Sequence, residues 1–280
     1  FFDDENSIPP VQILIDERNP LKAIRLGEES ILLKPVGQIT NDGDKWTRVD
    51  LTGVLSTGGN VRLNLHTENQ KRKVKVKTDN GGALLNSLDW INTIHGGEFN
   101  LVGEFTDRSS ETQFVGISSI KNFKLNESSV GVRILSLASL SGLSDAVTGT
   151  GISMRRAEVP FEVNKEKIKI LGAKARGANV GVIASGYIGR KSEAVALKGE
   201  IAPANVINSI LANIPVIKKI IGDGIIAVTY DVDGTLEEPK VTVNPLTVFA
   251  PGIFRKAFKE FDNENSDRGS SLAPENSISK

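Results

Sequence analysis

Apolar and polar residues alternate along much of this chain, and this period of two constrains its fold more than any other feature. In residues 61–66 every second residue is aliphatic, and in residues 73–77 valines alternate with lysines. Successive side chains of a β-strand point to opposite faces of a sheet, so these segments predict strands with one apolar and one polar face. The second half of the chain repeats the pattern in residues 167–175, 179–189, 194–201, 225–236 and 240–244.

The order of these segments predicts a mainly β protein. Helical patterns are few, and they do not alternate regularly with strands as a parallel α/β sheet would require. We expect one long antiparallel sheet, curled into a groove around its apolar face, with a few short helices at its ends and edges. Residues 1–261 form this domain in our interpretation. Residues 262–280 are rich in Asn, Ser, Asp, Glu and Gly and predict a disordered polar tail.

A pattern of apolar, any residue, glycine, any residue, apolar recurs five times, with the glycine on the apolar face. Glycine inside a strand usually marks a bend, a bulge or a close approach. A sheet that curls inward and leaves room along its midline would account for these positions. Ordinary β-bulges in a sandwich are the alternative interpretation. The glycines concerned are Gly53, Gly103, Gly186, Gly199 and Gly234.

Four segments predict helices between or after the strands. Residues 83–91 follow Asp79 and Asn80, either of which can cap a first helical turn. Residues 130–147 are apolar all round the helix axis, and residues 205–214 carry one apolar stripe before Pro215. The first of these two could fill the groove, and the second could cover one end of the sheet.

The fourth helix, at residues 246–261, has one broad apolar face opposite Arg255, Lys256 and Lys259. Such a helix suits a lid packed on the open end of the sheet, or a contact with the headgroups of a membrane. Pro251 and Gly252 would weaken or kink it. The residues proposed for the lid or membrane contact are Phe249, Ile253, Phe254, Phe258 and Phe261.

Composition excludes several classes of function. Lys and Arg number 34, as do Asp and Glu, so no overall field draws nucleic acid or an anionic membrane to the chain. Any membrane contact must be local. The chain has no Cys, and its two histidines, His66 and His95, are far apart in sequence. We therefore expect no metal, no other cofactor and no nucleic-acid partner.

One motif points toward an enzyme. Residues 230–236 match the first motif of haloacid-dehalogenase-like phosphatases, in which the residue equivalent to Asp231 is a nucleophile. That chemistry needs magnesium and further carboxylates from a doubly wound domain after the motif. Only one strand, one helix and a polar tail follow here. Residues 222–227 fit a dinucleotide-binding fingerprint loosely, but in the wrong order of helix and strand. We therefore expect no enzyme.

Three blocks of sequence carry a more extensive resemblance. The first is residues 78–88 with 96–103, the second residues 132–163, and the third residues 186–258, which include Asn213-Ile214-Pro215 and Phe249-Ala250-Pro251-Gly252. In their order and spacing they resemble the C-terminal region of AsmA-like envelope proteins, a bridge-like lipid-transfer family. Residues 1–77 share only the alternating strand pattern. The family has no catalytic residues to carry over.

The resemblance implies a sheet that conducts phospholipid or another acyl-chain lipid through the periplasm, between inner and outer membranes. It implies an inner-membrane tether, an N-terminal helix that this chain lacks, and we expect the chain to be a piece of a longer protein. A non-transporting structural or interaction module for outer-membrane biogenesis is the alternative, and the envelope protein partners are not identified. From the alternation, the residues expected to line the groove are Val61, Leu63, Leu65, Val180, Val182, Ala184, Leu197 and Ile201.

Overall fold

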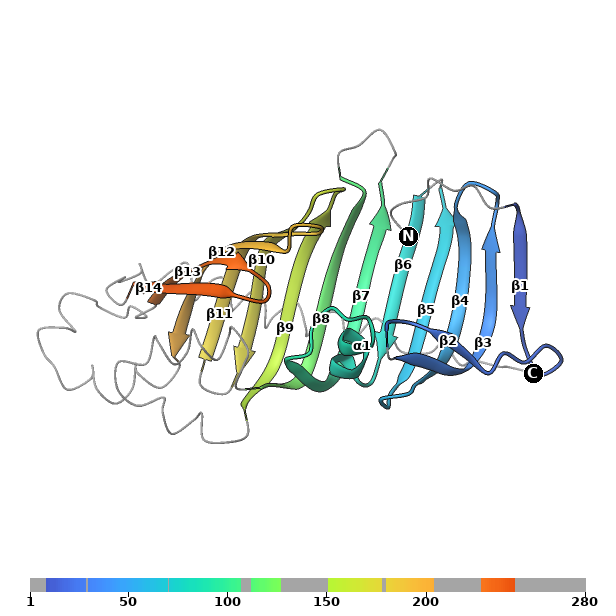
Figure 1. Ribbon diagram of the computed structural model, residues 1–280, viewed down its shortest axis with the longest axis horizontal. Coiled ribbons are helices and arrows are strands. Elements are labelled where there is room, and N and C mark those ends of the chain that lie inside the picture. Colours follow the sequence, from blue (N-terminus) through green and yellow to red (C-terminus); the bar gives the residue numbers. More distant parts are fainter. Residues whose placement is uncertain are drawn as a thin grey trace, which may run out of the picture.

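A computed structural model describes residues 9–28, 30–69, 71–106, 112–126, 151–177, 180–203 and 228–244. These residues form fourteen β-strands and one α-helix (Figure 1). All fourteen strands belong to one antiparallel sheet. The strands are β1 (Val11–Ile15), β2 (Ala23–Arg25), β3 (Ile31–Asn41), β4 (Trp46–Leu55), β5 (Asn60–Glu68), β6 (Lys71–Thr78), β7 (Ile94–Phe105), β8 (Phe114–Leu125), β9 (Ile152–Val163), β10 (Lys167–Gly177), β11 (Val180–Gly189), β12 (Ala194–Pro203), β13 (Val228–Thr235) and β14 (Pro239–Asn244).

From β3 onward each strand pairs with the next strand in sequence. At the other end, β1 and β2 share one edge of β3: β1 pairs with residues 37–41 and β2 with residues 31–33. The described sheet is open, with β14 at its far edge. In Figure 1 the first strands stand upright, whereas β12 to β14 run almost across the view, because the twist between neighbouring strands accumulates.

The strands predicted from the alternation are confirmed. Residues 61–66 and 73–77 lie in β5 and β6, and residues 167–175 and 194–201 lie in β10 and β12. Residues 240–244 fall within β14. The predicted strand at 225–236 is described from residue 228 onward, as β13. The mainly β, antiparallel prediction therefore holds for the described part of the chain.

The predicted helix at residues 83–91 is present, but its predicted bounds are wrong. The helix, α1, spans Gly81–Ser87. The Asn80 side chain caps it by accepting a hydrogen bond from the backbone N–H of Ala83 at 3.1 Å, so the helix begins two residues earlier than predicted. It ends early because Asp89 adopts a left-handed backbone conformation with φ +56°. Asp79, the other candidate cap, instead accepts hydrogen bonds from Asn60.

Helix α1 lies on one face of the sheet, over β7 and β8 (Figure 1). Leu84 and Leu85 are buried there. A Cβ at Gly81 would come within 2.8 Å of Phe99 and Ile120, so glycine at this position lets the helix approach the strands closely. The other predicted helices, at residues 130–147, 205–214 and 246–261, lie outside the described residues, as does the tail at 262–280.

Three of the five predicted strand glycines lie beneath large side chains. The Leu32 side chain covers Gly53, and a Cβ at Gly53 would be 2.6 Å from the Leu32 Cγ. The Phe114 ring covers Gly103 in the same way. The Tyr230 ring covers Gly199, and a Cβ at Gly199 would be 2.5 Å from the Tyr230 Cζ. The midline expected to be empty is therefore filled at these positions.

Each covered glycine belongs to a cross-strand arrangement in which a neighbour supplies the missing apolar surface. Gly199 pairs directly with Tyr230 in β13, and an aromatic partner across from glycine restores the packing that glycine lacks. The remaining two glycines are not bulged residues, because each has a direct register partner on both neighbouring strands. Gly186 and Gly234 have φ of +145° and +109°, conformations that favour glycine over other residues.

We predict that Gly53→Ala destabilises the protein by about 1–3 kcal/mol, because the new methyl group overlaps the Leu32 side chain. Leu32→Ala alone should cost about 2–5 kcal/mol, since Leu32 is 2% exposed. The double variant should be less destabilised than the sum of the two, because removing Leu32 makes room for the methyl group. Urea denaturation of all three measures the coupling, with Val54→Ala on the opposite face as the control. If the losses in unfolding free energy of the two single variants simply add in the double variant, the close contact between Gly53 and Leu32 is contradicted.

Candidate functional site

The strand register places one set of alternating residues on the same side of the sheet from β5 to β14. Leu63 of β5 pairs with Val76 of β6, which pairs with Leu101 of β7. Farther along, Val182 of β11 pairs with Ile201 of β12. We call this side the apolar face. It comprises Val61, Leu63, Leu65, Val74, Val76, Phe99, Leu101, Phe105, Phe114, Ile120, Ala157, Phe161, Val163, Ile168, Ala175, Val180, Val182, Ala184, Ile188, Val195, Leu197, Ile201, Tyr230, Val232, Val241 and Val243.

All eight residues predicted to line a groove lie on the apolar face. The structure thus brings together residues from β5, β11 and β12 on one side of the sheet. Of the predicted polar residues, Arg62, Asn64 and Lys198 lie on the opposite, outer face. Four of the eight are buried, namely Val61, Leu65, Val180 and Ile201, and four are partly buried against them, namely Leu63, Val182, Ala184 and Leu197.

The middle of the apolar face was not predicted residue by residue. Its aromatic residues come from β7, β8 and β9, where Phe105 and Phe114 meet edge to face with ring centroids 5.1 Å apart. Phe161 lies 5.9 Å from Phe114 by the same measure. The alternation is obscured in these strands because the outer face also carries aliphatic residues, including Val102 and Ile117. The phenylalanines resolve the faces in β7, where Phe99 and Phe105 are six residues apart, but not in β8, where Phe114 and Phe123 are nine apart and both buried.

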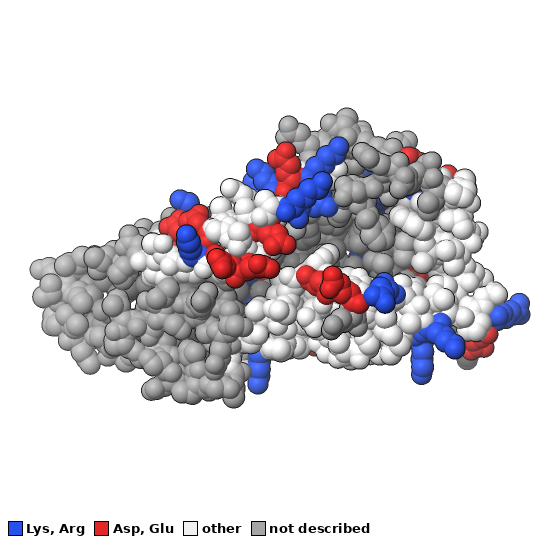
Figure 2. All heavy atoms as spheres, in the orientation of Figure 1, with Lys and Arg blue, Asp and Glu red and all other residues white. Residues whose placement is uncertain are grey.

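Charge is nearly absent from the apolar face. Arg72 is the one charged residue that the described register places on this side in β5, β6 and β10 to β14 and in residues 99–105, 114–120 and 157–163. Its guanidinium carbon lies 4.1 Å from the centroid of the Phe105 ring, a cation–π contact near the end of β6. Figure 2, which views the molecule from the α1 side, shows the charged side chains gathered in a few groups, with uncharged surface between them. The face therefore suits apolar ligands.

Tyr230 is the most strongly perturbed ionisable group of the apolar face. Its side chain is 4% exposed, and its hydroxyl donates a hydrogen bond to the Ile183 carbonyl oxygen at 3.1 Å. Burial raises the pKa of Tyr230 well above its ordinary value, and the nearby Glu200 carboxylate raises it further. Burial also raises the pKa of Glu200. The neutral phenol therefore fastens β13 to β11 across the intervening β12.

The phosphatase-like motif lies on the outer face. Asp231 pairs across β12 and β13 with Lys198, and the Asp231 Oδ1 lies 3.3 Å from the lysine Nζ. Asp233 faces Lys240 in the register of β14. The described residues contain no group of three or more His, Asp or Glu side chains placed to hold a metal ion. His66 and His95 are both exposed.

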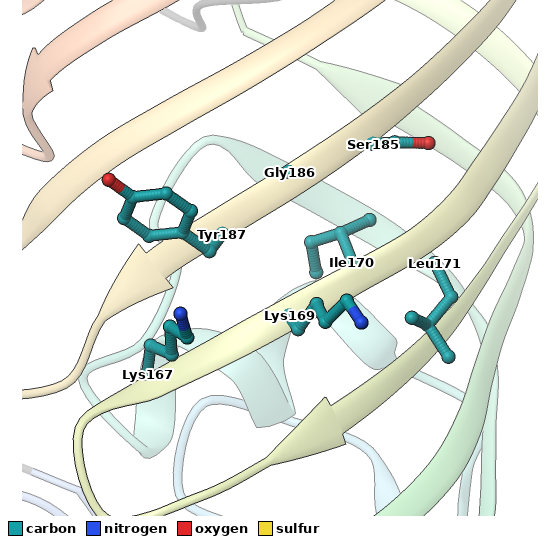
Figure 3. A pocket seen from close by; sticks show the side chains of 7 residues that line it. All are labelled: Lys167, Lys169, Ile170, Leu171, Ser185, Gly186 and Tyr187. Atoms are coloured by element: carbon teal, nitrogen blue, oxygen red, sulfur yellow. The ribbon is translucent and has the colours of Figure 1, made fainter.

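A separate hollow of about 380 Å³ lies between β10 and β11 (Figure 3). Its side chains come mainly from the outer face, and Lys167 and Tyr187 approach each other at its rim, with the lysine Nζ 5.2 Å from the ring centroid. Lys169 is engaged with Glu162, 3.8 Å away. The hollow is therefore not part of the apolar face. Its lining consists of Lys167, Lys169, Ile170, Leu171, Ser185, Gly186 and Tyr187.

Comparison with protein-family models, with curated proteins and with solved structures gave no match to this chain. Within the described ranges, no helix is both long and apolar enough to cross a membrane. The functional argument therefore rests on the geometry of the sheet and on the chemistry of its two faces.

We predict that Tyr230 makes stability fall as pH rises above about 10. Its pKa is raised in the folded protein, so the folded state holds the phenolic proton more tightly than the unfolded state. The stabilisation by Tyr230 is fully present below the pKa that the phenol has in the unfolded chain. It is lost as pH rises above that value toward the raised pKa of the folded protein. Thermal melts from neutral to alkaline pH should show a shallower alkaline loss for Tyr230→Phe than for the parent protein. Tyr187→Phe, at an exposed tyrosine, serves as the control, and parallel curves for all three would contradict the assignment.

Proposed function

We propose that this chain binds the acyl chains of lipids along its apolar face and conducts them along the sheet. The observation that carries the proposal is the continuity of the face: in β5, β6 and β10 to β14, and in residues 99–105, 114–120 and 157–163, the described register places no charged group on this side apart from Arg72 near a strand end. Each methylene removed from water contributes about 0.8 kcal/mol. A continuous apolar surface can therefore hold an acyl chain at many equivalent positions, without a specific site.

The proposal includes a groove and a cellular setting. A sheet that curls around its apolar face would shelter acyl chains and leave its charged outer face in water. The three sequence blocks that resemble AsmA-like envelope proteins support a place in the periplasm, tethered to the inner membrane, with phospholipid moving between the inner and outer membranes. The proposal involves no catalytic step.

A second candidate is a structural or interaction module of the envelope that carries no lipid. Leu32, Phe114 and Tyr230 favour this candidate because they occupy the space above the strand glycines. Filled positions of this kind stabilise the sheet but narrow any path along it. The two candidates differ in one measurable respect, which is whether the apolar face holds a lipid.

Lipid extraction separates the two candidates. The full chain is purified from cells without detergent, extracted with organic solvent and examined by mass spectrometry. Phospholipid or fatty acid in a reproducible molar ratio to protein supports transport. Protein that is folded, free of lipid and unable to take up a fluorescent acyl-chain probe supports the structural module.

We predict that Val182→Asp and Leu197→Asp each reduce the co-purified lipid severalfold. An unpaired carboxylate on an apolar surface costs several kcal/mol when a lipid chain covers it. Both side chains are only partly buried, so these variants can be tested for folding by circular dichroism and thermal melts. Ser185→Asp is the matched control, because Ser185 is exposed on the outer face of the same strand as Val182. Unchanged lipid content in a folded Val182→Asp protein would count against conduction.

The segment at residues 246–261 is proposed to act as a lid or as a membrane contact. If it contacts a membrane, the double variant Phe254→Asp with Phe258→Asp should abolish binding to liposomes and leave the melting temperature nearly unchanged. If it is a lid, the same variant should lower the melting temperature strongly, because two carboxylates enter a packed interface. Liposome flotation paired with a thermal melt decides between these roles. If the variant keeps both its liposome binding and its melting temperature, the segment is neither a membrane contact nor a lid.

A further inference from the structure

Three cations gather on the outer face of β5 and β6. Arg62 lies directly opposite Lys77 in the register, and Lys75 is two residues from Lys77 on the same side of the same strand. All three side chains are exposed. Like charges directly opposite each other on neighbouring strands destabilise a sheet, so this arrangement works against folding rather than for it.

The acidic groups around this cluster have other neighbours. Glu98, two residues from the Asn100 that pairs with Lys77, lies opposite Lys121 in the register. Glu68 holds Lys73, with 2.6 Å between the charged atoms, and Glu104 holds Lys71 at 2.7 Å. Asp79, which follows Lys77 by two residues, accepts hydrogen bonds from Asn60.

Asp50, on the neighbouring strand, is likewise occupied by Arg48 and Asn64. No ion pair within the described residues includes Arg62, Lys75 or Lys77. The cluster therefore leaves three positive charges unbalanced in a chain whose formal net charge is zero.

Two exposed aliphatic residues adjoin the cations. Val102 of β7 pairs with Lys75, and Ile117 of β8 pairs with Val102. Their side chains are 48% and 44% exposed on an otherwise polar face. Exposed aliphatic side chains next to unbalanced cations are typical of surfaces that meet a partner which is both anionic and apolar. We call Arg62, Lys75, Lys77, Val102 and Ile117 the outer patch.

We propose that the outer patch binds an anionic lipid surface. Charge complementarity favours the phosphate groups of lipids, and the two aliphatic side chains can enter the layer between headgroups. A peptide partner is disfavoured because β5 to β8 are interior strands, each hydrogen-bonded on both sides, so no edge is available for strand addition. The hollow between β10 and β11 belongs to other strands. The patch lies on the face opposite the apolar face, so the inference does not depend on lipid conduction.

The test measures co-sedimentation of the full chain with vesicles of phosphatidylcholine alone and of phosphatidylcholine with phosphatidylglycerol. The parent protein should bind the anionic vesicles more tightly, and salt should weaken this binding. The variant Arg62→Gln, Lys75→Gln and Lys77→Gln should lose roughly a hundredfold in affinity, given the contribution of each basic residue near an anionic surface. Its melting temperature should stay the same or rise, because the repulsion between Arg62 and Lys77 is removed.

A matched control removes three lysines from the other end of the outer face: Lys167→Gln, Lys198→Gln and Lys240→Gln. It changes the net charge equally and should reduce vesicle binding much less. Equal losses for both variants would overturn the proposal, since binding would then follow net charge alone. Val102→Ser with Ile117→Ser should weaken binding to anionic vesicles without changing its salt dependence, and an unchanged affinity would overturn the aliphatic contribution.

Two further arms identify the ligand. Inorganic phosphate or a soluble acidic peptide that binds the patch as tightly as the vesicles do would overturn the assignment to a lipid surface. Phe254→Asp with Phe258→Asp leaves the outer patch intact, so residual patch-dependent binding in that protein supports two separate contacts. The co-purified lipid should be unchanged in the outer-patch variant, which keeps failure of this inference distinct from failure of lipid conduction.

Discussion

The structure depends on an antiparallel register that is maintained from strand to strand. Because side chains alternate with a period of two, a slip of one residue between any two strands would move apolar residues to water for the rest of the sheet. The register does shift in β10, between Leu171 and Ala173. Gly172 absorbs the extra residue with φ +119°, so Ala173 and Ala175 return to the same side as Ile170. The bulge thus preserves the apolar face.

The strands were predictable where the outer face is uniformly polar. In β6 lysines alternate with valines, and the pattern alone assigns each residue to its face. In β7 and β8 the outer face also carries Val102 and Ile117, so local sequence does not distinguish the two sides, and only the pairing with neighbouring strands does. The bounds of α1 were missed for a related reason. The sequence offers two candidate caps, Asp79 and Asn80, and does not choose between them. The contact of Gly81 with Phe99 and Ile120, which lets the helix begin at this glycine, forms only between segments distant in sequence.

The candidate site was predicted in outline but not in its packing. Alternation identifies residues such as Val182 and Leu197 as apolar-face residues, because facing direction is a local property of a strand. What lies above a strand glycine is not local. Leu32, Phe114 and Tyr230 reach Gly53, Gly103 and Gly199 only after the strands have paired. The question of how much room the apolar face offers a ligand is therefore decided by tertiary contacts that periodicity does not encode.

The connection of each strand to its sequence neighbour has a consequence for how such a molecule changes in length. From β3 to β14, every pairing joins consecutive strands, so the sheet behaves as a nearly one-dimensional array in which each unit contacts mainly the units beside it. Adding or removing a hairpin would lengthen or shorten the array by about 4.8 Å per strand without rerouting any other connection. Insertion or deletion of hairpins can therefore adjust the distance that the sheet spans in small, equal increments.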